Sequence, residues 1–122
     1  MKKIIYLLLC SLLLTGCFKE TQTRFSIDEN KVVLVITQNT TEAEMARIAS
    51  ELKTKKNIDL DYSNSKFQAN GKISNVRLEV DCNDGFKGST QCSASALKGA
   101  NIGFIRDYQT GSDVVFHIGF MK

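Results

Sequence analysis

Apolar and polar residues alternate along most of the second half of the chain. Residues 58–62 alternate between apolar and acidic side chains, which predicts a strand with one face in a core. The apolar phase slips before residue 67, as a bulge would produce. The same period of two recurs in four further segments, at residues 73–82, 90–96, 102–108 and 113–120. Asn70-Gly71 is a strong hairpin signal, so the pattern predicts an antiparallel meander.

The first half of the chain combines a strand with a helix. Residues 31–37 are β-branched and apolar on both faces, which is typical of a central strand with both faces covered. Thr41 and Glu44 have the spacing of a helix capping box, and apolar residues recur at helical spacing from Met45 to Leu52, which predicts a helix that runs to about residue 56. We therefore predict an α+β domain in which a single helix packs on a mainly antiparallel sheet of about five to six strands.

The N-terminus has the pattern of an export signal. Lys2 and Lys3 precede an apolar stretch over residues 4–14, which ends in Leu14-Thr15-Gly16-Cys17. This ending resembles the lipobox of bacterial lipoproteins. The resemblance implies that residues 1–16 are removed and that Cys17 carries the lipid that holds the protein on a membrane. A retained membrane helix is the alternative, although the apolar stretch is shorter than the roughly 20 residues a span needs.

The lipobox sets the expected domain organisation and location. We predict a lipid anchor and tether over residues 17–30 and one α+β domain over residues 31–122. Many lipoproteins of bacteria with two membranes that stay in the inner membrane carry Asp after the lipidated cysteine, and this chain carries Phe18. The resemblance therefore implies an outer-membrane lipoprotein of the cell envelope, and leaves open whether the domain faces the periplasm or the cell surface.

Charge gives no reason to expect nucleic acid as a partner. Once the signal with Lys2 and Lys3 is removed, 14 basic residues face 13 acidic ones. The domain is thus close to neutral, and it lacks a basic stripe with interleaved aromatic residues.

Two cysteines remain after Cys10 leaves with the signal and Cys17 takes the lipid. Cys82 and Cys92 lie on the apolar phase of successive predicted strands. Because the compartment beyond the inner membrane is oxidising, we predict a Cys82–Cys92 disulfide between neighbouring strands. Two buried free thiols are the alternative.

The chain offers little catalytic chemistry. Its one histidine, His117, falls on an outward strand phase, and the soft ligands that zinc needs are too few. Residues 81–85 have the wrong spacing for a calcium loop and fit a turn better. Four outward carboxylates on two strands fit a solvated face, at Asp59, Asp61, Glu79 and Asp81. We predict a protein that is not an enzyme and has no cofactor or metal.

Several segments together resemble a small periplasmic module. They are V-L-V-I-T-Q-N-T-T-E-A-E-M, N-I-D-L-D-Y-S-N, N-G-K-I-S and I-G-F-I-R-D-Y-Q-T-G-S. The module occurs in short lipoproteins and after membrane-embedded zinc metallopeptidases of the antibiotic-sensor type. The resemblance covers about residues 31–119. The peptidase's His-Glu-x-x-His helix is absent from this sequence, and the module has no known functional residues to transfer.

Two functions fit these observations. The first is a non-catalytic binding or interaction module that is held on the membrane through Cys17 and binds an envelope protein. The alternative is an accessory or inhibitor subunit of an envelope enzyme, such as a membrane metallopeptidase. A single helix covers only two or three strands, so we expect apolar sheet surface around Val33, Val35 and Val115 to remain open as a partner site. The alternative is that this surface is covered, either because the sheet curls or because Phe25 and Ile27 fold across it.

Overall fold

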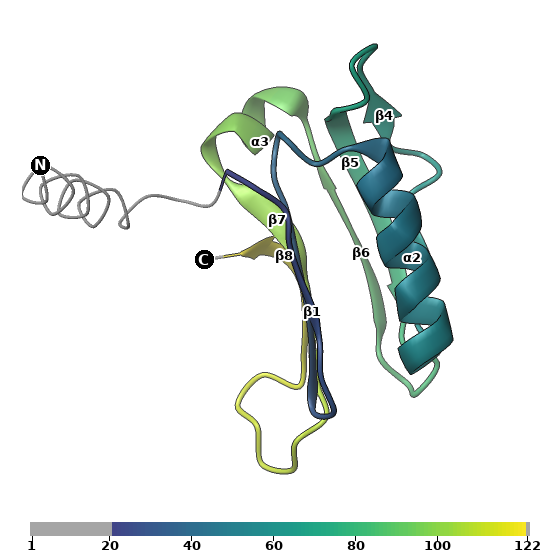
Figure 1. Ribbon diagram of the computed structural model, residues 1–122. Coiled ribbons are helices and arrows are strands. Elements are labelled where there is room, and N and C mark those ends of the chain that lie inside the picture. The colour runs from purple at the N-terminus through teal and green to yellow at the C-terminus, as the bar shows by residue number, and fades with distance from the viewer. Residues whose placement is uncertain (1–20, 122) are drawn as a thin grey trace, which may run out of the picture.

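The computed structural model describes residues 21–121, so the predicted signal peptide and Cys17 lie outside the described residues. Two antiparallel sheets and two helices form an α+β fold, as predicted (Figure 1). The first sheet has the order β1 (Arg24–Ile27), β2 (Lys31–Ile36), β7 (Asn101–Asp107) and β8 (Phe116–Met121). In the second sheet β5 (Ile73–Asp81) pairs with β3 (Asp59–Asp61), β4 (Lys66–Phe67) and β6 (Lys87–Cys92).

Helix α2 (Glu42–Lys56) forms as its end signals predict. Thr41 Oγ1 accepts a hydrogen bond from the backbone N–H of Glu44 at 3.2 Å, and the Glu44 carboxylate accepts one from the backbone N–H of Thr41 at 3.0 Å. Asn57 ends the helix in the left-handed conformation, with φ of 54°. Its N–H bonds to the last helical carbonyl groups, as a left-handed cap should. The buried stripe consists of Met45, Ile48 and Leu52.

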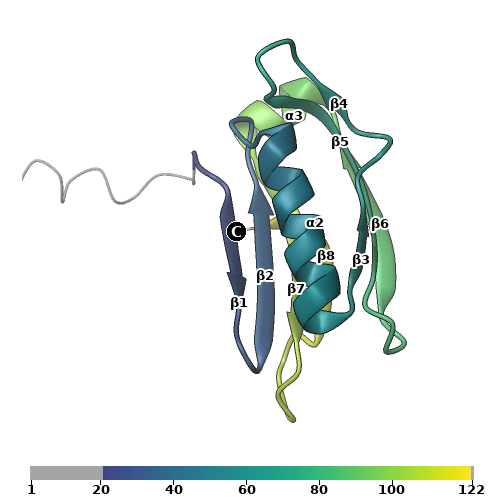
Figure 2. The same cartoon turned by 45° about the vertical axis from the view of Figure 1, so that its right-hand side comes forward.

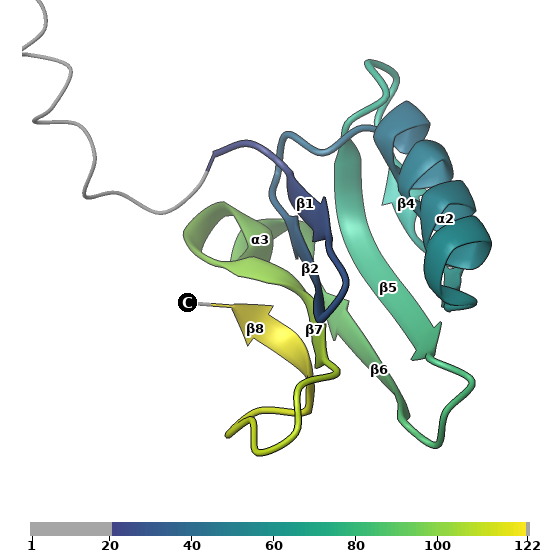
Figure 3. The same cartoon turned by 60° about the horizontal axis from the view of Figure 1, so that its bottom comes forward.

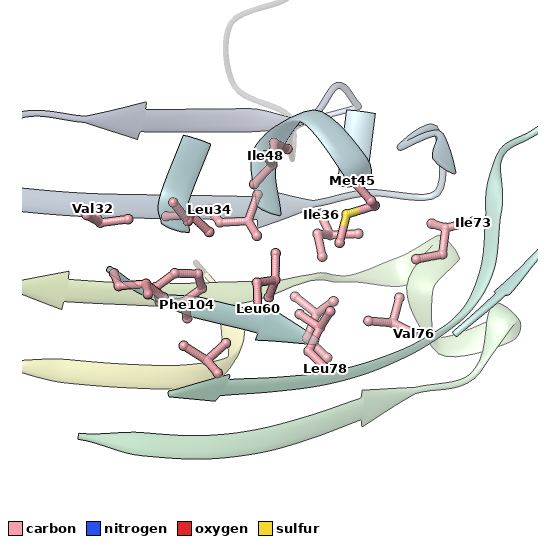
Figure 4. Packing of buried hydrophobic residues seen from close by; sticks show 14 of the residues in the cluster. Val32, Leu34, Ile36, Met45, Ile48, Leu60, Ile73, Val76, Leu78 and Phe104 are labelled. Carbon is pink, nitrogen blue, oxygen red and sulfur yellow. The ribbon is translucent and has the colours of Figure 1, made fainter. Parts of the chain in front are cut away.

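The core lies between the two sheets and is closed on one side by α2. The sheets come together at β6 and β8, where there is no room for a Cβ on Gly88 next to the Ile118 side chain. They diverge toward β2 and β3, and α2 lies along this opening (Figure 2). Side chains from both sheets and from α2 point into the space between them (Figure 4).

Three expectations about the fold are wrong. The strands form two sheets and not one. Each sheet has an apolar face, and the two apolar faces cover each other. The segment 90–96 does not continue as a strand: β6 ends at Cys92, and Ser93 caps a second helix, α3 (Ala94–Gly99), by accepting from the N–H of Ala96 at 3.3 Å. The predicted tether is also too long, since β1 pairs with β2 inside it.

The strands connect two ends of the molecule that differ in composition. The entry end contains Thr21, the loop 37–41, the turn 68–72, α3 and the last residues of β8. The far end contains the turns 28–30 and 82–86, Asn57 and the loop 108–115. Figures 1 and 3 show the chain entering at the first of these ends and turning back repeatedly at the second.

Candidate functional site

The predicted Cys82–Cys92 disulfide is not formed, and both thiols are free and buried. Cys92 pairs with Val76 in the β5–β6 hairpin, whereas Cys82 follows the last residue of β5. Six residues of strand therefore separate the two positions, about 20 Å at 3.3 Å per residue. A disulfide needs Cα atoms within about 7 Å of each other. The prediction identified the face of each cysteine correctly and missed the register of the hairpin.

The two thiols lie in environments that suppress nucleophilic chemistry. Burial, together with the nearby Asp84 carboxylate, raises the pKa of Cys82 to about 11. Burial also raises the pKa of Cys92. Because the thiolate is the reactive form, both side chains stay protonated and inert near neutral pH.

The far end is organised around Arg106. This side chain is only 9% exposed and donates to one carboxylate oxygen of Asp84, from Nε at 2.9 Å and from Nη2 at 2.7 Å. Its Nη1 donates to the backbone carbonyl of Asp107 at 2.6 Å. The guanidinium also lies over the rings of Phe86 and Tyr108, 4.5 and 4.4 Å from their centroids. Each nitrogen of the guanidinium therefore has a hydrogen-bond partner, as a buried arginine requires.

Four apolar residues of the far end, which we call the far-end patch, are Phe86, Val114, Val115 and Phe116. The Phe86 ring stacks on the Arg106 guanidinium, and the Val115 carbonyl accepts from Arg106 Nη1 at 3.3 Å. Phe86 is 37% exposed and lies 6.0 Å from the ring of Phe116, measured between centroids. Val114 is 48% exposed in the loop before β8. The Val115 carbonyl accepts from the N–H of Asp107 at 2.8 Å, which fixes this loop against β7. The patch is thus a firmly held surface that exposes apolar groups.

The three valines predicted as a partner surface do not form one open surface. Val35 lies on the outer face of the first sheet but is 1% exposed, so it offers no surface. Val33 is half-buried on the same face, opposite Ile105. Val115 belongs to the far-end patch. Phe25 and Ile27 do not cover the valines, because they pack against the core on the opposite face of the sheet.

The four acidic residues lie on a single face of the second sheet, as expected from the sequence. Asp59 pairs with Asp81, and Asp61 with Glu79, so like charges lie directly opposite each other. A hydrogen bond from Asn83, with Lys53 beside it, lowers the pKa of Asp59. The Ser63 hydroxyl lowers the pKa of Asp61. The carboxyls of Asp59 and Asp61 therefore stay ionised at neutral pH, as in a solvated charged face.

His117 is exposed on the outer face of the first sheet. Its Nε2 lies 2.9 Å from the backbone carbonyl of Phe120. Among residues 21–121, β8 pairs only with β7, so this contact occurs on the last strand of the sheet. The side chain therefore has a structural partner on its own strand.

Within residues 21–121, no group of three or more histidine, cysteine or carboxylate side chains could hold a metal ion. In the same part of the chain, no helix is long and apolar enough to cross a membrane. Comparison with known proteins found no matching family model, no similar curated protein and no similar solved structure.

The Arg106 site was not predicted, although the pattern of residues contained a signal for it. Ile102, Phe104 and Arg106 share the inward phase of β7, so a charged residue stands where the alternation requires an apolar one. A buried arginine requires a carboxylate partner. Nothing in the local sequence identifies Asp84 as that partner, because it lies far away in the chain, in the turn between β5 and β6 of the other sheet.

Proposed function

We propose that this protein is a lipid-anchored envelope protein, and that its domain is a non-catalytic module that binds another envelope protein through the far-end patch. The lipobox ending in Cys17 supports the anchor. The observation that supports binding is the exposure of Phe86 and Val114 on a surface that Arg106 and Asp84 hold in place. Rigid apolar surface of this kind is typical of a protein–protein contact.

The position of the patch supports a partner away from the membrane. The anchor lies before Thr21, which belongs to the entry end, and β7 spans seven residues between the two ends. At 3.3 Å per residue, the strand holds the patch about 23 Å from the point of entry. A partner can therefore contact the patch while the lipid stays in the bilayer.

Crosslinking from the patch tests this function. A photo-activated amino acid at position 114 of the lipidated chain should crosslink to a defined envelope protein. Val114→Asp, in a chain with the photo-activated residue at position 86, should abolish that product because it places a charge in the apolar contact. Thr110→Asp introduces the same charge in the same loop outside the patch and should leave the product unchanged.

The identity of the crosslinked product separates the two functions. One stable enzyme, recovered in constant proportion, supports an accessory or inhibitor subunit. A non-enzymatic envelope protein supports the interaction module. Equal crosslinking of the Val114→Asp and Thr110→Asp chains contradicts a binding role for the patch.

The anchor has its own test. Cys17→Ser removes the thiol that would carry the lipid, so the protein should lose fatty-acid labelling and leave the membrane fraction. Mass spectrometry of the N-terminal peptide identifies the acyl groups directly. A wild-type chain without acyl groups contradicts the lipoprotein assignment.

A further inference from the structure

The entry end begins very close to the proposed lipid. The Thr21 carbonyl accepts hydrogen bonds from Asn39 Nδ2 at 2.6 Å and from Thr37 Oγ1 at 3.1 Å, so Thr21 is fixed to the loop that follows β2. Thr23 adds a bond between its hydroxyl and that of Thr40, at 2.6 Å. Four residue steps separate Cys17 from Thr21, a reach of at most about 14 Å. A domain tied by so short a segment cannot rise clear of the lipid headgroups.

The surface at this end has the chemistry of a phosphate-binding groove. A groove of about 330 Å³ is lined by residues that include Asn39, Gln68, Asn70, Lys72 and Lys98, which carry amide and ammonium groups. Lys72 Nζ donates to Asn39 Oδ1 at 3.2 Å, which holds the ammonium at the groove. Ammonium groups and amide N–H groups are the donors that phosphate oxygens accept from.

An exposed aromatic ring lies at the same end. Phe120 pairs with Ile102 and is 56% exposed, more than the other two exposed large apolar residues. Ile102 also pairs with Ile36, the residue before Thr37, so the ring is two strands from the site where Thr21 is held. Aromatic rings beside lysines are typical of surfaces that rest at the level of lipid headgroups.

We propose that the entry end sits directly on an anionic phospholipid bilayer, with lipid phosphate in the Lys72–Lys98 groove and the Phe120 ring among the headgroups. This inference rests on the proposed anchor at Cys17 and adds an orientation to it. Seating fixes the domain upright, with the far-end patch directed away from the membrane.

Site-specific quenching tests the seating. The lipidated chain is placed in vesicles of phosphatidylethanolamine and phosphatidylglycerol that carry a quencher on their headgroups. A fluorophore is attached at Ser95→Cys on α3 or, in a second chain, at Thr110→Cys in the far-end loop. The buried Cys82 and Cys92 thiols do not compete for the label. Quenching should be several-fold stronger at position 95 than at position 110.

Matched variants identify the contacts. Lys72→Gln with Lys98→Gln should weaken quenching at position 95, because each lysine near an anionic surface changes the docking equilibrium by about fivefold. Lys31→Gln with Lys87→Gln removes the same charge at the far end and should change nothing. Phe120→Ser should also weaken quenching at position 95. Val114→Ser, at the far end, should leave that quenching unchanged.

The outcomes separate the seating from the anchor. A chain that does not float with the vesicles and lacks acyl groups contradicts the anchor and with it the seating. A chain that floats but quenches both labels equally contradicts the seating alone. Equal effects of the two lysine pairs would show that general charge, and not this groove, holds the domain.

Discussion

The two ends of the molecule are built on the same strands and differ in almost everything else. The entry end presents amide and lysine side chains around a groove, with one exposed ring, Phe120. The far end pairs the buried Arg106 with the partly exposed Asp84 beside apolar side chains, and it carries the acidic face. The sheets therefore supply the stability and the length of the molecule, whereas the segments that link the strands supply the surface chemistry of each end. Each end can therefore be altered separately.

The largest effect should come from a change that breaks both ends at once. Gly103 pairs with Val35 and Gly119 in the middle of the first sheet, and a Cβ there would collide with the Leu34 carbonyl. Gly103→Ala should therefore cost about 3 kcal/mol or more of the free energy of unfolding. Urea denaturation measures the loss. Gly99→Ala, which meets no neighbouring atom, should cost nothing, and equal stability of the two variants would contradict this packing.

A smaller effect should be confined to the far end. Asp84→Ala leaves the Arg106 guanidinium buried without its carboxylate. We expect a loss of about 2–3 kcal/mol, below the range for a fully buried pair because Asp84 keeps part of its side chain in water. Asp113→Ala, in the exposed loop of the same end, should stay within about 0.5 kcal/mol of wild type in urea. An equally small effect of both changes would show that the ion pair does not hold this end together.

Alkaline pH should also weaken the far end. The pKa of Cys82 is about 11 in the folded protein, against an ordinary value of 9.0. Below pH 9 both states hold the proton, so the thiol does not affect stability; above it the unfolded chain loses the proton first. The free energy of unfolding should therefore fall between about pH 9 and 11, by on the order of 2 kcal/mol from this group. Unfolding midpoints of wild type and Cys82→Ala across this range test the assignment, because the substituted protein should lose less. Parallel curves would contradict it.

The smallest effect concerns the acidic face. Glu79 lies opposite Asp61, and like charges in that position oppose pairing. Glu79→Gln should raise the free energy of unfolding by at most about 0.5 kcal/mol and lose that gain in high salt. Thermal unfolding at low and high ionic strength is sensitive enough to detect it. A destabilised variant would mean that Glu79 has a favourable partner and that the face is not simply solvated.

Local signals in the sequence predicted most of the secondary structure. Helix α2 forms between the cap at Thr41 and the left-handed Asn57, and β5 buries the face that its alternation indicates. The bulge expected before Phe67 is present where β4 meets β5. These features depend on residues close together in the chain, which is why the pattern identifies them.

The remaining features depend on contacts between distant residues. Alternation gives the face of Cys92 but not its register, and the start of β6 at Lys87 places it opposite Val76. Strand β1 was not predicted because the alternation in Arg24–Ile27 extends over only four residues, and pairing with β2 makes this segment a strand. The Arg106–Asp84 pair joins two sheets and has no local signal at Asp84.

The pairing of β1 with β2 has a mechanical consequence if the domain is held at Cys17, as we propose. Tension on that anchor would reach Thr21 first, where Asn39 and Thr37 hold the backbone, and would then pull β1 along its own axis. The four pairs from Arg24–Val35 to Ile27–Val32 are then loaded together and do not open one by one. Phe25 and Ile27 also pack against the core, so β1 cannot leave without exposing it. Strand β1 thus transmits the load to the core and does not yield ahead of it.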